Sequence, residues 1–272
     1  MNKKFLALLS AAAMMTTLMV GCGGNNDSQP STGSTNEGSE AALTTVTPGT
    51  LTVSTNATFP PYEMTDDSGN VVGIDVDIAN AIAEKLGLEL EVIDMDFDAS
   101  LLAVQNGKSD ICMAGLSITP DRAAVMDFST SYATGVQVVI VKEGSDVTMD
   151  NLGEQMIGTQ RGTTGFLYAS DTPENGGYGE DHVVAYDDGI TATKALVNDQ
   201  IDCVIIDKAP AQEYVKANPG LTILEGDWVN EDYSIGVAKG NTAMLEAVNG
   251  ALEELIADGT VQSIIDTYIT AG

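Results

Sequence analysis

Residues 102–115 read LAVQNGKSDICMAG, and residues 194–207 follow the same pattern as KALVNDQIDCVIID. Each stretch gives the end of an amphipathic helix, a turn, an aspartate and then an apolar run typical of a buried strand. When the aspartates that precede the two runs are aligned, Gly115 falls opposite Asp207, each at the carboxyl end of its strand. Ligands of open α/β sheets bind outside those ends, so two facing units of this kind would bring both positions to one cleft. The alternative is that the two stretches share only the strand and helix pattern that is common to all α/β proteins.

The first of these strands runs on into residues 114–122, AGLSITPDR, a segment with the pattern of a helix start. Thr119 is expected at the N-cap and Pro120 at the first helical position. Arg122 and Arg161 are the only arginines of a chain that carries 40 acidic residues. A hydroxyl-rich turn, a helix N-terminus and an arginine that face one spot would form an anion site. The alternative is that Arg122 pairs with a neighbouring acid.

The chain beyond residue 48 continues this alternation of strands and helices. Strands are predicted over residues 51–54, 88–92, 110–113, 136–141, 156–159, 183–186, 203–206, 221–224 and 232–241. Helices are predicted over residues 76–86, 98–104, 191–197, 209–217 and 242–258, with further helices after residue 165 and at the C-terminal end. Asp98 is expected to cap the second of these helices. The alternation indicates the α/β class, and roughly 225 residues suffice for one large or two small domains.

The N-terminal segment is set apart from the fold because it has the composition of a targeting signal. Residues 1–21 combine a basic start, an apolar run shorter than a membrane span and a final small residue, as in a signal peptide. Cys22 follows directly and resembles the lipobox cysteine of bacterial lipoproteins, although Met19 stands where leucine is usual. The alternative is a plain secreted protein. Residues 22–47 are rich in Gly, Ser, Thr, Asn and acids, and we expect them to form a flexible tether.

The charge balance and the rare residue types exclude several classes of function. The chain has 40 acidic against 11 basic residues, a formal net charge of −29, and should avoid nucleic acid and anionic lipid surfaces. Cys112 and Cys203 lie inside apolar runs and are interpreted as buried thiols rather than a disulfide. The single histidine, His182, has no other His or Cys near it, so zinc sites and Ser-His-Asp chemistry are poorly supported. We expect no metal and no other cofactor.

Six motifs, taken in order, resemble one known family. They are TFPPYE (58–63), GNVVGIDVDIANAIAEKLG (69–87), FDASLLAVQNGKSDICMAGLSITPDRAAVMDFSTSY (97–132), RGTTG (161–165), IDCVIID (201–207) and IGVAKGN (235–241). No single motif is decisive, whereas six in one order are specific. Through them the chain resembles the type II periplasmic binding proteins that capture polar amino acids for ABC transporters.

The resemblance implies an α/β fold of two lobes, each a mixed sheet flanked by helices, joined by two hinge strands. The first hinge falls near residues 131–138, and the return falls near residues 232–235. Lobe one is then discontinuous, with residues 48–133 plus 234–272, and lobe two has residues 134–233.

The resemblance also assigns residues to the carboxylate of an amino acid ligand. Arg122 should hold the α-carboxylate with its planar guanidinium, an arrangement that lysine cannot copy. Ser117 should add a backbone N–H, and Thr164 should add another at a helix start. Thr163 stands beside Thr164 in RGTTG and is counted with it.

The ligand's ammonium group is assigned to the strand-end positions. Asp207 should receive the α-ammonium, and the carbonyl of Gly115 is a further acceptor, with no side chain there to keep the ligand away. The hydroxyl of Ser117 can reach the same group. The alternative for Asp207 is an exposed carboxylate at a strand end. Arg161 either enters the cleft or pairs with a surface acid, and we expect the latter.

Two aromatic residues are expected beside the ligand's side chain. Phe59 and Phe97 stand where the family sandwiches that side chain, although ordinary core packing is the alternative for Phe97. Asn56 stands where members that bind basic ligands can carry an aspartate, which puts a basic specificity in doubt. Tyr62 and Glu63 lie in the same loop and are weaker candidates.

These expectations describe binding without bond breaking. The lobes close on the amino acid, and an ABC transporter permease recognises the closed form. The alternatives are a dehydratase on the same fold, for which only Glu63 remains as an unassigned acid, and an amino acid sensor. The lack of a signalling domain before Gly272 favours delivery to a separate transporter. We expect a monomer on the outer side of the cell membrane, anchored by lipid on Cys22.

Overall fold

The computed structural model describes residues 43–269 and has the α/β organisation that the sequence predicts. Its main sheet has nine strands in the order β5-β1-β6-β12-β7-β10-β8-β9, with β11 paired to β7. A second, small sheet has the order β2-β3-β4. The predicted signal peptide, Cys22 and the predicted tether up to residue 42 lie outside the described residues.

The elements have the following bounds. The strands of the main sheet are β1 (Thr50–Thr55), β5 (Glu89–Asp94), β6 (Ile111–Cys112), β7 (Met126–Lys142), β8 (Ile157–Gln160), β9 (Val183–Tyr186), β10 (Cys203–Asp207), β11 (Leu221–Ile223) and β12 (Val229–Ala238). The small sheet has β2 (Thr58–Phe59), β3 (Glu63–Thr65) and β4 (Val71–Val72). The α-helices are α1 (Ile74–Leu86), α2 (Phe97–Gln105), α3 (Pro120–Val125), α4 (Thr164–Ser170), α5 (Gly189–Val197), α6 (Lys208–Ala217), α7 (Thr242–Ala257) and α8 (Thr260–Tyr268). Short 3₁₀ turns are η1 (Met149–Glu154), η2 (Pro173–Asn175) and η3 (Glu180–His182).

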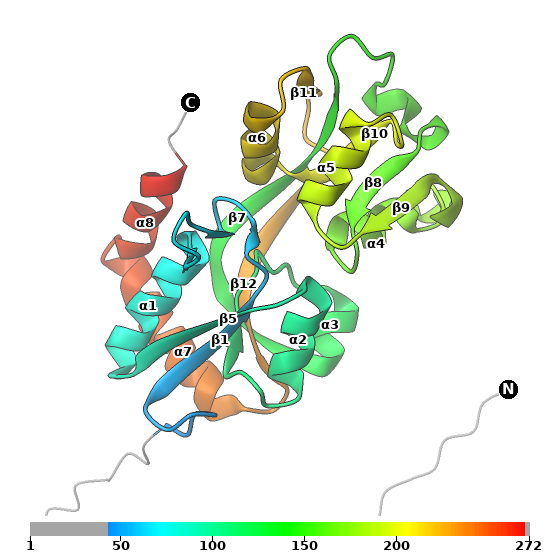
Figure 1. Cartoon of the computed structure of the whole chain (residues 1–272). Helices are drawn as coiled ribbons and strands as arrows, with labels where there is room; N and C mark the ends of the chain where they lie inside the picture. The colour runs from blue at the N-terminus through cyan, green and yellow to red at the C-terminus, as the bar shows by residue number, and fades with distance from the viewer. Residues whose placement is uncertain (1–42, 270–272) are drawn as a thin grey trace, which may run out of the picture. The chain divides into compact units, whose positions relative to one another are not determined.

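Two long strands, β7 and β12, join the two halves of the main sheet (Figure 1). They run antiparallel, with Gln137 opposite Val229 and Met126 opposite Ala238. On one side β12 pairs with β6, and on the other β7 pairs with β10, so each lobe is built onto this pair. Both predicted hinge segments lie within it. The two-lobe fold with two hinge strands is confirmed, whereas the residues at which one lobe passes into the other stay a prediction.

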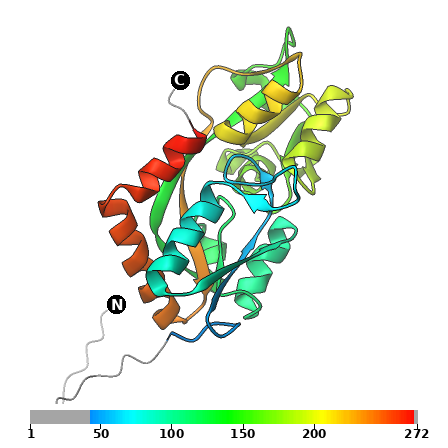
Figure 2. The ribbon, with the colours of Figure 1, turned by 60° about the vertical axis from the view of Figure 1, so that its left-hand side comes forward.

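Helix α1 shows how the sequence builds the core of the first lobe. Ile74, Ile78 and Ile82 recur every four residues, so they share one face, and all three are fully buried. Burial of each such side chain contributes roughly 1.5–3 kcal/mol. This face packs in one cluster with residues of α7 and α8, which lie beside α1 (Figure 2). The first lobe therefore takes its core from segments far apart in the sequence.

Strand β10 shows why a central strand of the second lobe has an unbroken apolar sequence. Cys203 and Ile205 pack in one buried cluster, and Val204 and Ile206 pack in another. Successive side chains of a strand point to opposite faces, so a strand covered on both faces must be apolar throughout. Asp207, the last residue of β10, breaks this run at the edge where the site lies.

The similarity of the two stretches around Asp110 and Asp202 extends to their contacts. Asp110 Oδ2 accepts a hydrogen bond from Thr52 N at 2.8 Å, and Asp202 Oδ2 accepts one from Met156 N at 2.7 Å. Each carboxylate thus holds the neighbouring strand, β1 or β8, next to its own. The two stretches therefore share this contact in the structure as well as their sequence pattern.

Two local expectations differ from the structure. Asp98 is not the cap of α2: the helix begins one residue earlier, because the buried Phe97 is already helical, and Asp96 is at the N-cap. Asp98 lies in the first turn, where a negative charge still favours the helix dipole. The last residues assigned to the tether also contact the folded part, since Val46 N donates to Asp110 Oδ1 at 2.8 Å.

The remaining described features concern thiols and membrane spans. Cys112 and Cys203 are free and buried, as predicted, and burial raises their pKa values to about 11 and about 12. Within residues 43–269, no helix has both the length and the apolar character needed to cross a bilayer.

Candidate functional site

A pocket between the two lobes collects most of the predicted ligand residues. Its empty volume, including space that is open to solvent, is about 470 Å³. The residues that line it are Asn56, Phe59, Glu63, Phe97, Ala114, Gly115 and Arg122 before the first hinge strand, and Gln137, Gln160, Thr163, Thr164, Ile205, Ile206, Asp207 and Glu231 after it begins. Gly115 and Asp207, the equivalent strand-end positions, are both in this set.

Besides the weaker candidate Tyr62, Ser117 is the one predicted ligand residue of the folded part that does not line the pocket. It is buried, its carbonyl accepts a hydrogen bond from Arg122 Nη1 at 2.7 Å, and it forms an isolated β-bridge with Tyr233. Ser117 therefore orients the arginine, and its direct contact with a ligand stays a prediction.

Arg122 is fixed by a short helix and by contacts on both lobes. The N-cap Thr119 accepts a hydrogen bond from Arg122 N at 3.2 Å, as the sequence predicts. Arg122 Nη2 donates to Gly162 O of the second lobe at 3.0 Å, and the guanidinium lies 5.3 Å from the centre of the Phe97 ring. Burial lowers the pKa of Arg122, yet a guanidinium stays protonated in proteins. Two of its five N–H donors are engaged in the described contacts, which leaves donors for an anion in the pocket.

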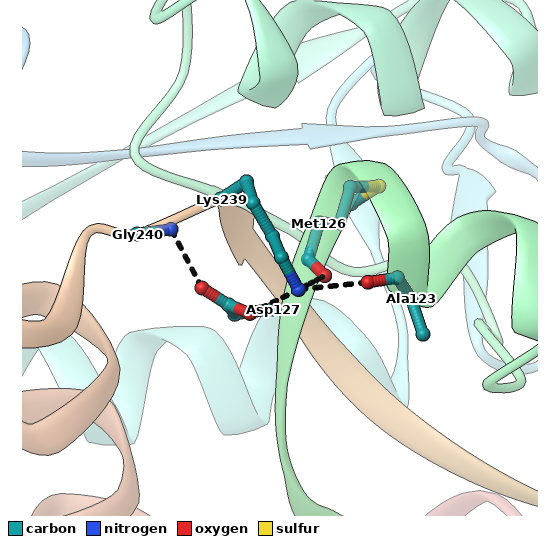
Figure 3. A network of polar contacts seen from close by, with 5 residues as sticks. All are labelled: Ala123, Met126, Asp127, Lys239 and Gly240. Carbon is teal, nitrogen blue, oxygen red and sulfur yellow. Dashed lines mark hydrogen bonds and ion pairs between the residues drawn. The ribbon is translucent and has the colours of Figure 1, made fainter. Parts of the chain in front are cut away.

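A network at the C-terminal end of α3 holds the helix that carries this arginine (Figure 3). Lys239 Nζ donates to Ala123 O at 2.7 Å and to Met126 O at 3.3 Å, and it pairs with Asp127 Oδ1 at 2.8 Å. Gly240 N donates to the other oxygen of Asp127 at 2.7 Å. The last carbonyls of a helix lack partners inside the helix, so this network satisfies one of them, Ala123 O, and ties α3 to the end of β12.

Gly115 has a backbone that requires glycine. Its φ is +52°, and an added Cβ would lie 2.7 Å from the Phe59 ring. The space that the missing side chain leaves is thus filled by Phe59, rather than left open for a ligand. Both residues still line the pocket.

Asp207 forms the opposite wall with two further polar residues. Gln137 Nε2 donates to Asp207 Oδ2 at 2.9 Å and to Glu231 Oε2 at 3.0 Å, and Thr164 Oγ1 donates to Glu231 Oε2 at 2.9 Å. Burial raises the pKa of Asp207 to about 7, and the charge of Glu231 raises it further. Asp207 stands at the N-cap of α6 without capping it. Its carboxylate is therefore available to the pocket.

Several buried acceptors in this pocket have no partner within the described residues. They are Glu63 Oε2, Gln137 Oε1 and Glu231 Oε1. An unsatisfied buried acceptor costs about 1–3 kcal/mol, so such atoms require an explanation. All three are acceptors, so each would be satisfied by a hydrogen-bond donor brought into the pocket.

Contacts across the pocket place the two lobes against each other. Gln160 Nε2 of β8 donates to Asn56 Oδ1 at 2.8 Å, and Tyr214 OH of α6 donates to Thr58 O at 2.6 Å. Together with the bond from Arg122 to Gly162, they span the gap at separate points. This is the geometry of a closed cleft.

Some lining residues were not singled out by the sequence. Gln137 and Glu231 lie on the hinge strands, and Gln160 ends β8. The signal that could have found Gln137 is its polarity inside the apolar run VQVVIV. Glu63 was a weak candidate and is almost fully buried in the pocket wall.

Arg161 lies outside the pocket. Its Nη2 is 3.7 Å from Asp187 Oδ1, and both side chains are largely exposed. The expected pairing with a surface acid is confirmed. No group of three or more His, Cys, Asp or Glu side chains that could hold a metal occurs in the part of the chain that the structure describes.

The fold and the pocket define a two-lobed protein with a largely polar pocket between its lobes. The family model of the bacterial extracellular solute-binding proteins, family 3, matches residues 51–271, and the chain belongs to this family. It is therefore an extracytoplasmic solute-binding protein, and its relatives are binding proteins rather than enzymes.

Three relatives illustrate the match. The chain is 33% identical over 277 residues to the probable histidine-binding protein of Neisseria gonorrhoeae, which covers 98% of this chain and 95% of that protein. It is 33% identical over 218 residues to ABC transporter arginine-binding protein 1 of Escherichia coli K12, covering 78% of this chain and 88% of that protein. The structure of an ancestral arginine-binding protein bound to arginine superposes with a TM-score of 0.75 at 39% identity, covering 81% of this chain and 98% of that one.

Proposed function

We propose that this protein captures an amino acid between its lobes and delivers it to the permease of an ABC transporter. The observation that carries the proposal is that Arg122 and Asp207 line one pocket from opposite walls, matching the two charges of a zwitterion. The α-carboxylate lies on the free donors of Arg122, with the backbone N–H of Thr164 at the start of α4. Asp207 and the carbonyl of Gly115 take the α-ammonium.

The ligand's side chain carries a positive charge, as in arginine. The orphan acceptors of Glu63, Gln137 and Glu231 support this, because a guanidinium or ammonium supplies several N–H donors at once. The relatives include proteins named for histidine and arginine. Asn56, which put a basic ligand in doubt, already bonds Gln160, while acids elsewhere in the pocket supply the negative charge.

Closure follows from the division of contacts between the lobes. Arg122 belongs to the first lobe and Asp207 to the second, so only the closed arrangement gains both ends of the ligand. A ligand shifts the open–closed equilibrium by its difference in affinity for the two states. With both charged ends desolvated, an affinity at or below micromolar Kd, about −8 kcal/mol, is expected.

The remaining parts of the proposal concern place and partners. The protein acts without catalysis, as a monomer, and lipid on Cys22 anchors it to the cell membrane. The enzyme and sensor alternatives find no support in the family.

Calorimetric titration of the purified protein with each of the twenty amino acids tests the function. Arginine, lysine or histidine should bind with a Kd of about 1 μM or lower. Binding of a neutral or acidic amino acid alone would refute the cationic substrate and keep amino acid capture. Binding of none would contradict amino acid capture itself.

A further inference from the structure

A buried pair of carboxyl groups forms part of the pocket wall. Glu63 opens β3 and lines the pocket, and Asp75 lies directly behind it in the first turn of α1. Each residue is only 1% exposed. Asp75 N donates to Tyr62 O at 2.9 Å, next to Glu63, so the backbone holds the two acids close together, and two ionised carboxylates buried this close are unfavourable.

The neighbours of Asp75 identify it as the charged member of the pair. Gly115 N donates to Asp75 Oδ2 at 3.0 Å, and Tyr132 OH donates to Asp75 Oδ1 at 2.8 Å. These bonds favour its ionised form against burial, which raises its pKa to about 6. Glu63 has no such support: burial first and Asp75 second raise its pKa well above the usual range. One proton therefore resides on Glu63 at neutral pH and is shared with Asp75.

The groups around the pair provide no compensating cation. Those that act electrostatically on Glu63, or on which Glu63 acts, are Asp75, Asp94, Cys112, Tyr62, Tyr132 and Tyr214. They are acids, phenols and a thiol. The pocket's cation, Arg122, is engaged with Ser117, Gly162 and Phe97. The free protein therefore neutralises the Glu63 site with a proton, and Glu63 Oε2 still lacks a donor.

We propose that a cationic ligand side chain displaces the proton shared by Glu63 and Asp75, so that this pair selects the ligand by its charge. The inference rests on the proposed function, because it needs an amino acid that brings a positive group to Glu63. The O–H bond of Glu63 breaks, the proton passes to water, and the ligand's cation faces the two carboxylates. No other bond changes. Glu63 is the specificity-determining residue, and Asp75 is a positioning residue that acts through it.

The exchange makes binding depend on pH with a definite sign. Where the free pair holds its proton, release of one proton raises the affinity for a cationic ligand by up to about tenfold per pH unit. An uncharged ligand of the same shape leaves the proton in place, because the neutral pair has no charge to compensate. Protons released on binding thus report the charge of the side chain.

Proton counting by calorimetry tests the proposal directly. The protein is titrated at pH 7 with L-arginine and with L-citrulline, its uncharged isostere, in buffers of different ionisation enthalpy. Protonated Asp207 also releases its proton to the solvent when any α-ammonium binds beside it, so that contribution is common to both ligands. Arginine should release about one proton more than citrulline. Equal proton counts for the two ligands would overturn the inference while leaving the proposed function intact.

Variants of the pair give a second, independent measurement of the protons released when the ligand binds. Glu63→Gln keeps the shape and has no proton to release, so it should bind arginine at least tenfold more weakly and release one proton fewer. Tyr132→Phe removes a bond that stabilises ionised Asp75 and should move the pH window of proton release upwards. Glu91→Gln, an exposed acid of β5, should match the wild type in both readouts. A Glu63→Gln protein that releases as many protons as the wild type would contradict the assignment, and failure of arginine, lysine and histidine to bind the wild type would remove the proposed substrate and the inference together.

Discussion

Replacing Arg122 by lysine keeps a positive charge in the pocket and removes the planar fork. Arg122 is 7% exposed, and its two terminal nitrogens reach Ser117 O and Gly162 O while further donors face the pocket. A lysine presents all its donors from one nitrogen and cannot serve these directions together with a carboxylate. The variant loses one bond to the ligand and one between the lobes. At roughly 1.5 kcal/mol for each hydrogen bond to a charged group, the Kd rises about 150-fold.

The chain offers a matched control for this change. Arg161, the other arginine, pairs with Asp187 at the surface, so Arg161→Lys should bind within about twofold of the wild type. Calorimetric titration with the ligand found in the amino acid screen gives both Kd values, and thermal melting checks that both variants fold. A folded Arg122→Lys protein that binds as tightly as Arg161→Lys would refute the assigned role of Arg122.

Three further perturbations address the opposite wall, the aromatic support and the closed state. Burial raises the pKa of Asp207 to about 7. Between about pH 4 and 7 the folded protein therefore holds a proton that the unfolded chain has released, so this group makes the free energy of unfolding fall as pH rises through that window. Asp207→Asn removes the proposed partner of the α-ammonium and should abolish ligand binding. The same change removes the cost of ionising a buried carboxyl group, so the melting temperature of the ligand-free protein at pH 8 should rise by roughly 5 °C, measured by calorimetry. An unchanged or lower melting temperature would contradict the burial argument. Phe97→Ala removes a buried ring beneath Arg122 and should cost about 3 kcal/mol in urea unfolding as well as weaken binding, and a loss below 1 kcal/mol would show that the ring is not core. Gly162→Ala strains a residue with φ +72° and pushes against the Asp98 side chain across the cleft, so ligand should bind about tenfold more weakly and small-angle scattering should show a more open protein; unchanged scattering and affinity would argue against a closing contact there.

The fold was predictable from the sequence where burial requires a regular pattern of apolar residues. The isoleucines of α1 and the apolar run of β10 predict their elements closely, and the predicted strand at residues 183–186 matches β9 residue for residue. The predicted strand at residues 136–141 is only the apolar part of β7. Its first half mixes polar and small residues, because it pairs with β12 in the hinge region rather than packing in the centre of a lobe, and such a strand has no apolar run to detect.

The site was predictable where a residue type is rare and has one common role, and less so where the residues that act together are distant in sequence. A rare arginine after a helix cap points to an anion; Arg122 does line the pocket, and its contact with an anion stays a prediction. Glu231 could not be found this way, because one acid among 40 carries no information until the hinge strands bring it beside Gln137. Ser117 marks the opposite limit: a resemblance placed it at the ligand, whereas the structure shows only that its carbonyl accepts a hydrogen bond from Arg122, and its contact with a ligand stays a prediction.

The discontinuous first lobe has a consequence for the protein during its synthesis. A growing chain presents β1, β5 and β6 early, but β12 and the helices that cover α1 come last. The second lobe, whose strands and helices lie between, can complete its core while the first still shows bare apolar surface to chaperones and proteases. Premature termination before α7 should therefore leave one compact lobe attached to an aggregation-prone remnant, rather than a uniformly weakened protein.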